Sequence, residues 1–586
     1  MRLRAPVKAQ RSPPPEEPGG REGDLHGHAA SGSGALEGMG QAMSASSVNA
    51  PIPSHSESQD TEAVSKPLPS PGVSVNASFT EADVARASAL LEAMQEDPLV
   101  IDGVSEEARE RLLEAVGRIA NPVRTPQARM AKALRRRRQK AEREAKFEHD
   151  RELRKSTRIR TLRQAPVFRS DLLLPDGAPP QAEAPEEAAE LQTPRRCYVC
   201  KEEYRRLHFF YDALCPSCGD LNHAKRFQRA PLEGKVALIT GARVKIGYQA
   251  SLMLLRSGAE VVATTRFPQD AALRYAAEDD FAAWSHRLHI HGLDLRHVPS
   301  VERFAQHLES TLGRLDILIN NAAQTVRRPP GFYAHLLKGE QVPTRTLPSH
   351  LQPLLRSHEQ VVASLRPEAS TDALVPAWDN ADAGLGIHAS ALLSQIPYTL
   401  EPEYLPEVFP EGKLDADLQQ VDLREVNSWR LRLGEVSTAE MLEVHLINAV
   451  APFVLCGKLR GLMNRDRSEP RHVVNVSAME GIFSRGTKTD KHPHTNMAKA
   501  ALNMMTLTSA RDYARDGIYM NAVDTGWVTD EDPAQHADRK REELDFQPPL
   551  DIVDGAARVV DPVFAAVNSG EPAWGNFFKD YFPGKW

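Results

Sequence analysis

Apolar residues follow two spacings along the C-terminal part of the chain, and their alternation predicts a parallel sheet flanked by helices. Short β-branched runs at 236–240, 260–265 and 288–294 are separated by stretches such as 246–257, in which apolar residues recur at helical spacing. Repeated strand–helix–strand units form parallel sheets with right-handed crossovers. We therefore expect a doubly wound α/β domain over residues 231–586.

The N-terminal third has a different pattern. Residues 1–78 are rich in Pro, Gly, Ser and Glu with few aromatics, so they predict a disordered tail. Apolar residues return at helical spacing in 79–165, where Thr80 is a candidate helix cap. Residues 166–193, rich in Pro, Ala and Glu, predict a linker.

A basic segment at 124–163 lies within the helical region. Arg and Lys alternate with Glu and Asp at helical spacings, which is typical of a solvated, charge-paired helix. The alternative is a contact with a protein or a nucleic acid, centred on Arg135–Arg138 and Lys155–Arg160. No aromatic platform interleaves with these charges, so the solvated helix is favoured.

Composition adds little about partners. The formal net charge of −7 predicts solubility and indicates neither a nucleic-acid nor a membrane partner. The chain has no run of 18 apolar residues, and its first 20 residues lack the apolar core of a secretory signal. We expect a cytoplasmic protein without a membrane segment.

Four of the five cysteines form one cluster, Cys197-x-x-Cys200 and Cys215-x-x-Cys218. Paired CxxC turns of this kind close a tetrahedral thiolate site, and four protein ligands leave no position for water. The cluster predicts a structural zinc in a knuckle over 194–229. Four unrelated buried cysteines or a redox CxxC pair are the alternatives.

A glycine turn follows the first strand of the α/β domain, in KVALITGARVKIG at 235–247. Gly241 suits a tight turn and Gly247 suits a close approach between helix and strand, where a helix N-terminus binds a pyrophosphate. Lys245 stands where a third glycine is usual in such turns. Its side chain either crowds the pyrophosphate or neutralises it. The same fold also accepts sugar nucleotides or flavins.

Later motifs resemble those of the short-chain dehydrogenase/reductase (SDR) family in type and order. Asn320-Asn321-Ala322-Ala323 is similar to the family's NNAG, and Asn448, Ser477 and Lys499 follow in family order. The segment 521–529, NAVDTGWVT, resembles the family's N-A-x-x-P-G-x-V. The resemblance implies a Rossmann fold that binds NAD(P), interrupted by an insertion at about 325–436.

The resemblance also implies which residues hold the cofactor. At the end of the second strand, Thr265 and Arg266 replace the acidic residue that binds the ribose of NAD, so NADP is favoured over NAD unless Arg266 only caps the loop. The candidate cofactor residues are Thr240, Gly241, Arg243, Lys245, Ile246, Gly247, Thr265, Arg266, Asp294, Leu295, Asn321, Ala322, Lys499, Gly526 and Thr529.

The candidate catalytic residues depart from the family at one position. Family members carry a tyrosine four residues before the lysine, and Thr495 stands there. The resemblance implies that Asn448 holds a relay water, that Ser477 polarises the substrate oxygen and that Lys499 orients the ribose. Three accounts of the proton follow: His494 serves as the acid, a tyrosine of the insertion reaches in (Tyr333, Tyr398 or Tyr404), or the domain binds nucleotide without turnover. His494 is otherwise a surface residue at a helix start.

The sequence thus predicts an NADP-dependent oxidoreductase acting on a carbonyl or alcohol, with NAD as the alternative cofactor. The rival function is a non-catalytic nucleotide sensor or interaction protein that uses its zinc knuckle and basic helix. Residues 575–586, rich in aromatics, predict a cover for the substrate side or a homo-oligomer interface.

Overall fold

A computed structural model describes residues 78–120, 126–168, 190–365, 381–396, 407–486 and 488–586. The predicted tail at 1–77 lies outside these residues, as does most of the predicted linker. The chain divides into two compact units, Met1–Glu114 and Ala115–Trp586.

The first unit contains short helices. Helix α1 (Glu81–Glu96) begins at Thr80, whose hydroxyl accepts the Asp83 amide while the Asp83 carboxylate accepts the Thr80 amide, so the predicted cap is confirmed. The 3₁₀ turn η1 (Pro98–Ile101) follows, and α2 (Glu106–Ala120) begins in this unit and runs past its end.

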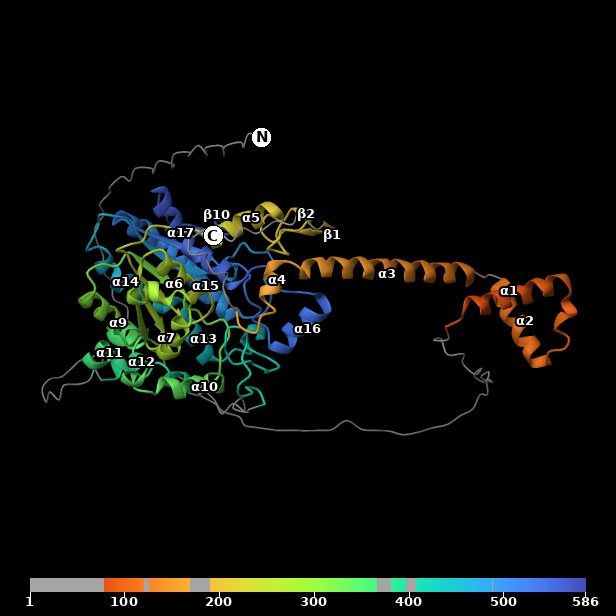
Figure 1. Ribbon diagram of the computed structural model, residues 1–586, viewed down its shortest axis with the longest axis horizontal. Coiled ribbons are helices and arrows are strands. Elements are labelled where there is room, and N and C mark those ends of the chain that lie inside the picture. Colours follow the sequence, from red (N-terminus) through yellow and green to blue (C-terminus); the bar gives the residue numbers. More distant parts are fainter. Residues whose placement is uncertain (1–77, 121–125, 169–189, 366–380, 397–406, 487) are drawn as a thin grey trace, which may run out of the picture. The chain divides into compact units, whose positions relative to one another are not determined.

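The second unit is built on an eight-stranded sheet, which confirms the predicted α/β class (Figure 1). The strand order is β10-β9-β8-β7-β6-β3-β4-β5, and every neighbouring pair is parallel except β9 and β10. The strands are β3 (Val236–Thr240), β4 (Glu260–Thr265), β5 (Leu288–Gly292), β6 (Ile317–Asn320), β7 (Arg471–Ser477), β8 (Ile518–Asp524), β9 (Phe577–Lys579) and β10 (Phe582–Gly584).

Helices cover both faces of the sheet. One apolar core joins the sheet to α6 (Lys245–Arg256), α7 (Pro268–Ala276) and α17 (Ile552–Ser569). The other joins it to α9 (Val298–Thr311), α14 (Ala451–Met463) and α15 (Pro493–Arg515). The buried strands have apolar residues on both faces because both faces are covered. Shorter helices complete this body: α8 (Phe281–Trp284), η2 (Ser285–Arg287), η9 (Met479–Gly481) and α16 (Ala534–Leu544).

The predicted insertion adds several short helices beside the sheet. The largest, α11 (Gln352–Ser364), packs on the edge strand β5. The others are α10 (Pro330–Glu340), η3 (Thr344–Thr346), η5 (Ala381–Gly384), α12 (Leu385–His388), η6 (Leu392–Gln395) and η7 (Ser428–Arg430). Tyr398 and Tyr404 lie outside the described residues.

The basic segment forms α3 (Pro126–Lys155) and α4 (Arg158–Leu162). The middle of α3 is exposed, whereas near its end the Asp150 carboxylate accepts the amides of Gln192 and Thr193 at 2.7 and 2.9 Å. Those two residues belong to β1 (Glu190–Arg196), so the linker prediction is wrong for 190–193, because these residues gain a strand partner in β2 (Glu203–Arg206).

Helix α13 (Thr438–His445) continues into α14 through one π-helical turn, η8 (Leu446–Val450). By length and composition alone, the run Thr438–Met463 is apolar enough to cross a membrane. Half of its apolar window is buried, and α14 packs on α9, as expected of a core helix. This run is weak evidence for a membrane segment.

Candidate functional site

The glycine turn between β3 and α6 has the backbone that the sequence predicts. Gly241 has φ of +68°, and a Cβ there would lie 2.9 Å from the Ala322 Cα. A Cβ at Gly247 would lie 2.2 Å from the Gly241 carbonyl oxygen, so only glycine fits either position. The Asn321 side-chain amide donates to the carbonyls of Thr240 and Gly241 at 2.9 and 3.1 Å. These contacts fix the turn against β6.

Lys245 opens α6 with φ of +54°, a left-handed conformation that glycine adopts more readily. Its backbone therefore keeps the shape that a glycine would give. Although burial acts to lower the pKa of Lys245, the carboxylates of Glu531 and Asp417 hold it above its usual value. Carboxylates of the chain itself thus act on the Lys245 ammonium. The two predictions for this side chain, crowding or neutralising a pyrophosphate, considered no such partner.

The end of β4 is covered by the insertion. The Arg266 guanidinium donates to the Tyr333 hydroxyl at 2.6 Å and stacks on that ring at 4.6 Å. Tyr333 is buried with Phe267, Phe332 and other apolar residues. The Tyr333 hydroxyl is thus engaged at the end of β4, three strands away from β7, which carries Ser477, so Tyr333 is not placed to supply the proton. The Thr265 hydroxyl also has a partner within the chain, because it accepts a hydrogen bond from the Phe267 amide at 3.1 Å.

The end of β5 is covered in the same way. The Asp294 amide donates to the Gly386 carbonyl of α12 at 2.7 Å, and the Asp294 carboxylate is held by the Arg296 guanidinium at 2.6 Å. Leu295 is buried beside it. The Ser390 hydroxyl donates to the Arg266 carbonyl at 2.9 Å. Peptide groups at both strand ends are thus paired with the insertion. We call this region, the ends of β4 and β5 with residues 385–392, the covered half.

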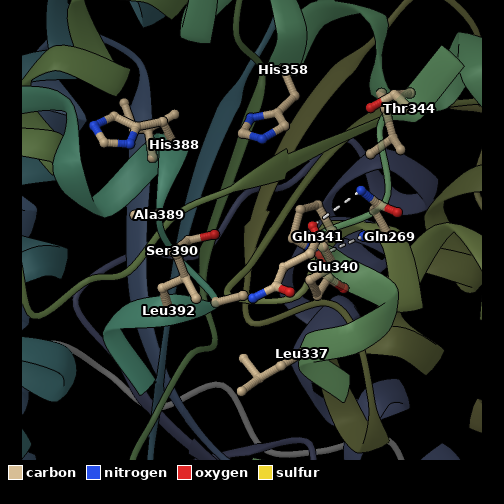
Figure 2. A pocket seen from close by; sticks show the side chains of 14 residues that line it. Gln269, Leu337, Glu340, Gln341, Thr344, His358, His388, Ala389, Ser390 and Leu392 are labelled. Carbon is tan, nitrogen blue, oxygen red and sulfur yellow. Dashed lines mark hydrogen bonds between the residues drawn. The ribbon is translucent and has the colours of Figure 1, made fainter. Parts of the chain in front are cut away.

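A pocket of about 270 Å³ lies beside the covered half, between α7, α10, α11 and residues 387–392 (Figure 2). Glu340 lies on its wall and accepts the amides of Gln269 and Asp270 at 3.1 and 2.9 Å, at the start of α7. Burial raises the pKa of Glu340 to about 7 despite these two amides. Arg243, a predicted cofactor residue, is nearby but pairs with Asp270 at 2.6 Å.

The carboxyl end of β7 and the start of α15 bring predicted catalytic residues together. The Lys499 ammonium donates to the Val476 carbonyl at 2.7 Å, and burial lowers its pKa to about 8. The Ser477 hydroxyl donates to the Asn503 side chain at 2.5 Å. A Cβ at Gly481 would lie 2.6 Å from the Lys499 carbonyl carbon, so α15 is held close to the loop that follows β7.

Two neighbouring side chains on α15 are buried with unpaired polar atoms. The Thr495 hydroxyl and the His494 Nδ1 have no hydrogen-bond partner among the described residues, although both side chains are about 2% exposed. His494 Nε2 lies 3.6 Å from the Glu440 carboxylate. His494 is therefore buried, and the prediction that it is a surface residue at a helix start is wrong. Buried polar atoms without partners are costly and mark a place for a ligand or water.

Glu440 is the functional candidate that the sequence analysis missed. It occupies the third position of α13, where the Ser437 hydroxyl accepts its amide at 3.2 Å, and this S-x-x-E spacing is typical of a helix cap. The carboxylate instead faces His494. Although burial acts to raise the pKa of Glu440, the contact with His494 holds it below its usual value. The S-x-x-E spacing alone does not separate these two roles.

Asn448 lies in the π-helical turn, a geometry that is frequent at functional sites. Its side chain accepts the Gln324 amide at 2.7 Å and donates to the Gln324 carbonyl at 3.1 Å, just after β6. Gly526 has φ of +76°, and the Thr529 hydroxyl donates to Glu531 at 2.6 Å. We call the ends of β7 and β8 with the start of α15 the reaction half.

The four predicted metal ligands converge. The sulfur atoms of Cys197, Cys200, Cys215 and Cys218 all lie within 4.8 Å of one another, and those of Cys200 and Cys215 are 3.7 Å apart. Tetrahedral zinc with bonds of about 2.3 Å needs sulfurs about 3.8 Å apart, so the set fits zinc. His208 takes no part, because its Nδ1 accepts the amides of Phe210 and Tyr211. Helix α5 (Pro216–Arg226) carries the last ligand.

Two segments of the chain match family models. Residues 235–336 match the short chain dehydrogenase model, and residues 426–551 match the enoyl-(acyl carrier protein) reductase model. These matches support the SDR family for the two segments on either side of the insertion. Together they leave more than half of the chain unmatched.

Relatives of known sequence share parts of the chain. An uncharacterized protein of Acanthamoeba polyphaga mimivirus, R665, is 28% identical over 396 residues, 66% of this chain and 74% of that protein. The WW domain-containing oxidoreductase of Drosophila melanogaster is 37% identical and human retinol dehydrogenase 13 is 34% identical, each over 16% of this chain. The chain spans only 22% and 28% of the length of these two proteins.

Solved structures show a weak overall likeness. NADPH-bound carbonyl reductase from chicken fatty liver is 16% identical, with 60% of this chain and 99% of that chain covered and a TM-score of 0.35. The RhlG/NADP complex of Pseudomonas aeruginosa is 16% identical, with 59% and 94% covered and a TM-score of 0.35.

Proposed function

We propose that this chain is an NADP-dependent oxidoreductase of the SDR family that acts on a carbonyl or alcohol, with a modified proton relay. The observation that carries the proposal is the set of buried polar side chains at the reaction half. Ser477, Thr495 and Lys499 stand on the strand and helix that the family uses, and unpaired polar atoms remain beside them. The matches of the flanking segments to SDR models support the same function.

NADP, when bound, supplies or accepts the hydride. Gly241, Gly247 and Gly526 allow the close turns of the backbone at which its phosphates and nicotinamide would lie, and Lys499 would bind its ribose. NADP is favoured over NAD because β4 ends in Thr264 and Thr265 and Arg266 follows it, with no carboxylate among them to repel a 2′-phosphate. Arg266 can bind that phosphate only after it leaves the Tyr333 hydroxyl.

The proton is assigned to His494. An imidazole held next to a carboxylate can carry a proton near neutral pH, whereas the Thr495 hydroxyl is too weak an acid to do so. In this relay, Glu440 stabilises the protonated ring, His494 moves the proton at a ring nitrogen, and Ser477 turns its hydroxyl from Asn503 to the substrate oxygen. Thr495 contributes a hydrogen bond and no proton.

The test is oxidation of NADPH by purified protein against a panel of aldehydes and ketones, with NADH in parallel. His494→Gln should reduce kcat by about 100-fold, the usual contribution of a positioned acid. His472→Gln is the matched control. Like His494, His472 is buried, but it stands on β7 at the opposite end of the strand from Ser477. Equal rates in the two variants would contradict the relay.

The covered half supports one alternative, a non-catalytic nucleotide-binding protein. The Asp294 amide is paired with Gly386 and the Arg266 carbonyl with Ser390, so in this alternative residues 385–392 hinder the adenosine of a dinucleotide. Binding of NADPH without turnover in the panel would favour this alternative. Structural zinc, a contact through α3, homo-oligomerisation and a cytoplasmic location stay proposals that the sequence suggests.

A further inference from the structure

The four-cysteine knuckle packs against the body through buried polar contacts. The Tyr211 hydroxyl donates to the Asp554 carboxylate at 2.5 Å, and the Arg226 guanidinium donates to Asp551 at 2.6 Å. Both carboxylates stand at the start of α17. All four side chains are buried, so the contacts hold the knuckle in one orientation. The knuckle is therefore part of the second unit and not a separate module.

Tyr198 extends from the knuckle to the reaction half. It stands between the ligands Cys197 and Cys200, and its own amide donates to the Ala213 carbonyl at 2.9 Å. Its phenol oxygen accepts the backbone amide of Trp527 at 2.9 Å. A Cβ at Gly526 would lie 3.4 Å from the same oxygen.

Apolar contacts extend the same interface. Val528 is about 8% exposed and belongs to the knuckle's own core, together with Tyr204, Leu207 and Tyr211. Ile246, next to Lys245 in the glycine turn, packs on this core as well. Two segments with predicted cofactor residues, 245–247 at the pyrophosphate turn and 526–529 after β8, thus contact the knuckle through Ile246 and Val528.

The position of Tyr198 depends on the ligand turn that carries it. Six residues, 197–202, join β1 to β2, and the backbone bonds Cys197 N–H to Glu202 C=O and Lys201 N–H to Cys197 C=O, at 2.9 and 3.1 Å, shape the turn between them. A knuckle of this size gains its folding free energy from the bound metal. Without metal, the Cys197–Cys200 turn is no longer tied to Cys215 and Cys218 and keeps only its backbone hydrogen bonds, so the acceptor for Trp527 is held less firmly.

We propose that the metal-loaded knuckle braces segment 526–528, with Tyr198 as the positioning residue that fixes the Trp527 amide. Loss of the brace loosens this segment, and the affinity for the dinucleotide falls with it. Only that effect on affinity rests on the proposed function. The brace itself is a contact within the chain and can be measured with no cofactor present.

The test is hydrogen exchange of a peptide covering 525–529 in the zinc-loaded full chain. Tyr198→Phe keeps all four cysteines and removes the acceptor, so exchange of this peptide should accelerate about 5-fold, as expected for one hydrogen bond worth about 1 kcal/mol. Tyr204→Phe is the matched control: it removes a hydroxyl that donates to the Asp212 carbonyl within the knuckle, at 2.8 Å. Its 525–529 peptide should exchange as in the wild type.

Removal of zinc by a chelator should accelerate hydrogen exchange of the same peptide at least as much as Tyr198→Phe does. Re-addition of zinc should reverse the change. Equal exchange in both tyrosine variants, or full protection in metal-free protein, would overturn the brace. NADPH titration separates the two proposals. Faster exchange in Tyr198→Phe with no NADPH binding even in the wild type leaves the brace standing and sinks the proposed function.

Discussion

The covered half and the reaction half lie at the same edge of one sheet, yet they differ in how their polar groups are satisfied. At the covered half, Arg266 and Asp294 are paired with Tyr333, Arg296 and the backbone of α12. At the reaction half, the polar atoms of His494 and Thr495 are buried with no such partner in the part of the chain that the structure describes. The insertion therefore completes one half of the site and leaves the other to a ligand.

This difference shows that family motifs locate a site without stating whether it is open. The strand ends, glycines and lysine lie where the SDR pattern implies. Their availability is set by two parts outside the pattern, the insertion on one side and the knuckle on the other.

Metal removal should have the largest effect, and it should be confined to the knuckle and the reaction half. Structural zinc contributes on the order of 10 kcal/mol to the folding of small zinc domains. We expect a chelator to lower the thermal unfolding temperature by several degrees or to create a separate early transition, measured by calorimetry. An unchanged transition with less than about one zinc per chain would contradict the four-thiolate site.

Lys499→Ala should reduce kcat by about 100-fold or more, because the buried ammonium orients groups at the reaction half. Steady-state NADPH oxidation measures the loss. Lys458→Ala, an exposed lysine on α14 that pairs with Glu302, is the control and should retain full activity. A variant at Lys499 with normal turnover would place the chemistry elsewhere.

Tyr333→Phe should act in the opposite direction and tighten NADPH binding. It removes the hydroxyl that accepts the Arg266 guanidinium and keeps the ring, so Arg266 is released for a 2′-phosphate. A hydrogen bond worth about 1 kcal/mol corresponds to about a 5-fold lower Kd by calorimetric titration. Tyr248→Phe, which removes a hydroxyl bonded to Glu278 on the far side of α7, should leave the Kd unchanged. Weaker binding in Tyr333→Phe would mean that Tyr333 belongs to the cofactor site.

Glu340→Gln should have the smallest effect, a change in the pH dependence of stability. Burial raises the pKa of Glu340 to about 7 from an ordinary value of 4.5, so the folded protein binds the proton more tightly than the unfolded chain. This contribution is fully present below pH 4.5 and is lost as the pH rises through 7. Urea unfolding measures the free energy of unfolding at pH 5 and at pH 8. Between these two values it should fall less for Glu340→Gln than for the wild type. Glu359→Gln, exposed on α11, should behave as the wild type.

Much of the fold followed from the sequence because the strands and helices obey local rules. The β-branched runs became β3, β4 and β5, Thr80 caps α1, and the four cysteines converge as their spacing indicates. The start of β1 was assigned to a linker, since its pairing with β2 depends on residues farther along the chain.

The site was less predictable, because its key contacts join distant segments. The Arg266 contact with Tyr333 and the Tyr198 contact with Trp527 each link residues from separate elements, and no periodicity reveals them. Glu440 was hidden by a helix-cap pattern that explained it locally. Long-range partners of this kind are set by tertiary packing and not by local sequence.

On the proposed function, a dinucleotide binds the reaction half and opens the covered half as it does so. Hydrogen exchange of the full chain with and without NADPH tests this claim most directly. We predict slower exchange in peptides covering 240–247 and 525–529 and faster exchange in 385–392. Unchanged exchange in all three peptides at saturating NADPH would contradict the claim.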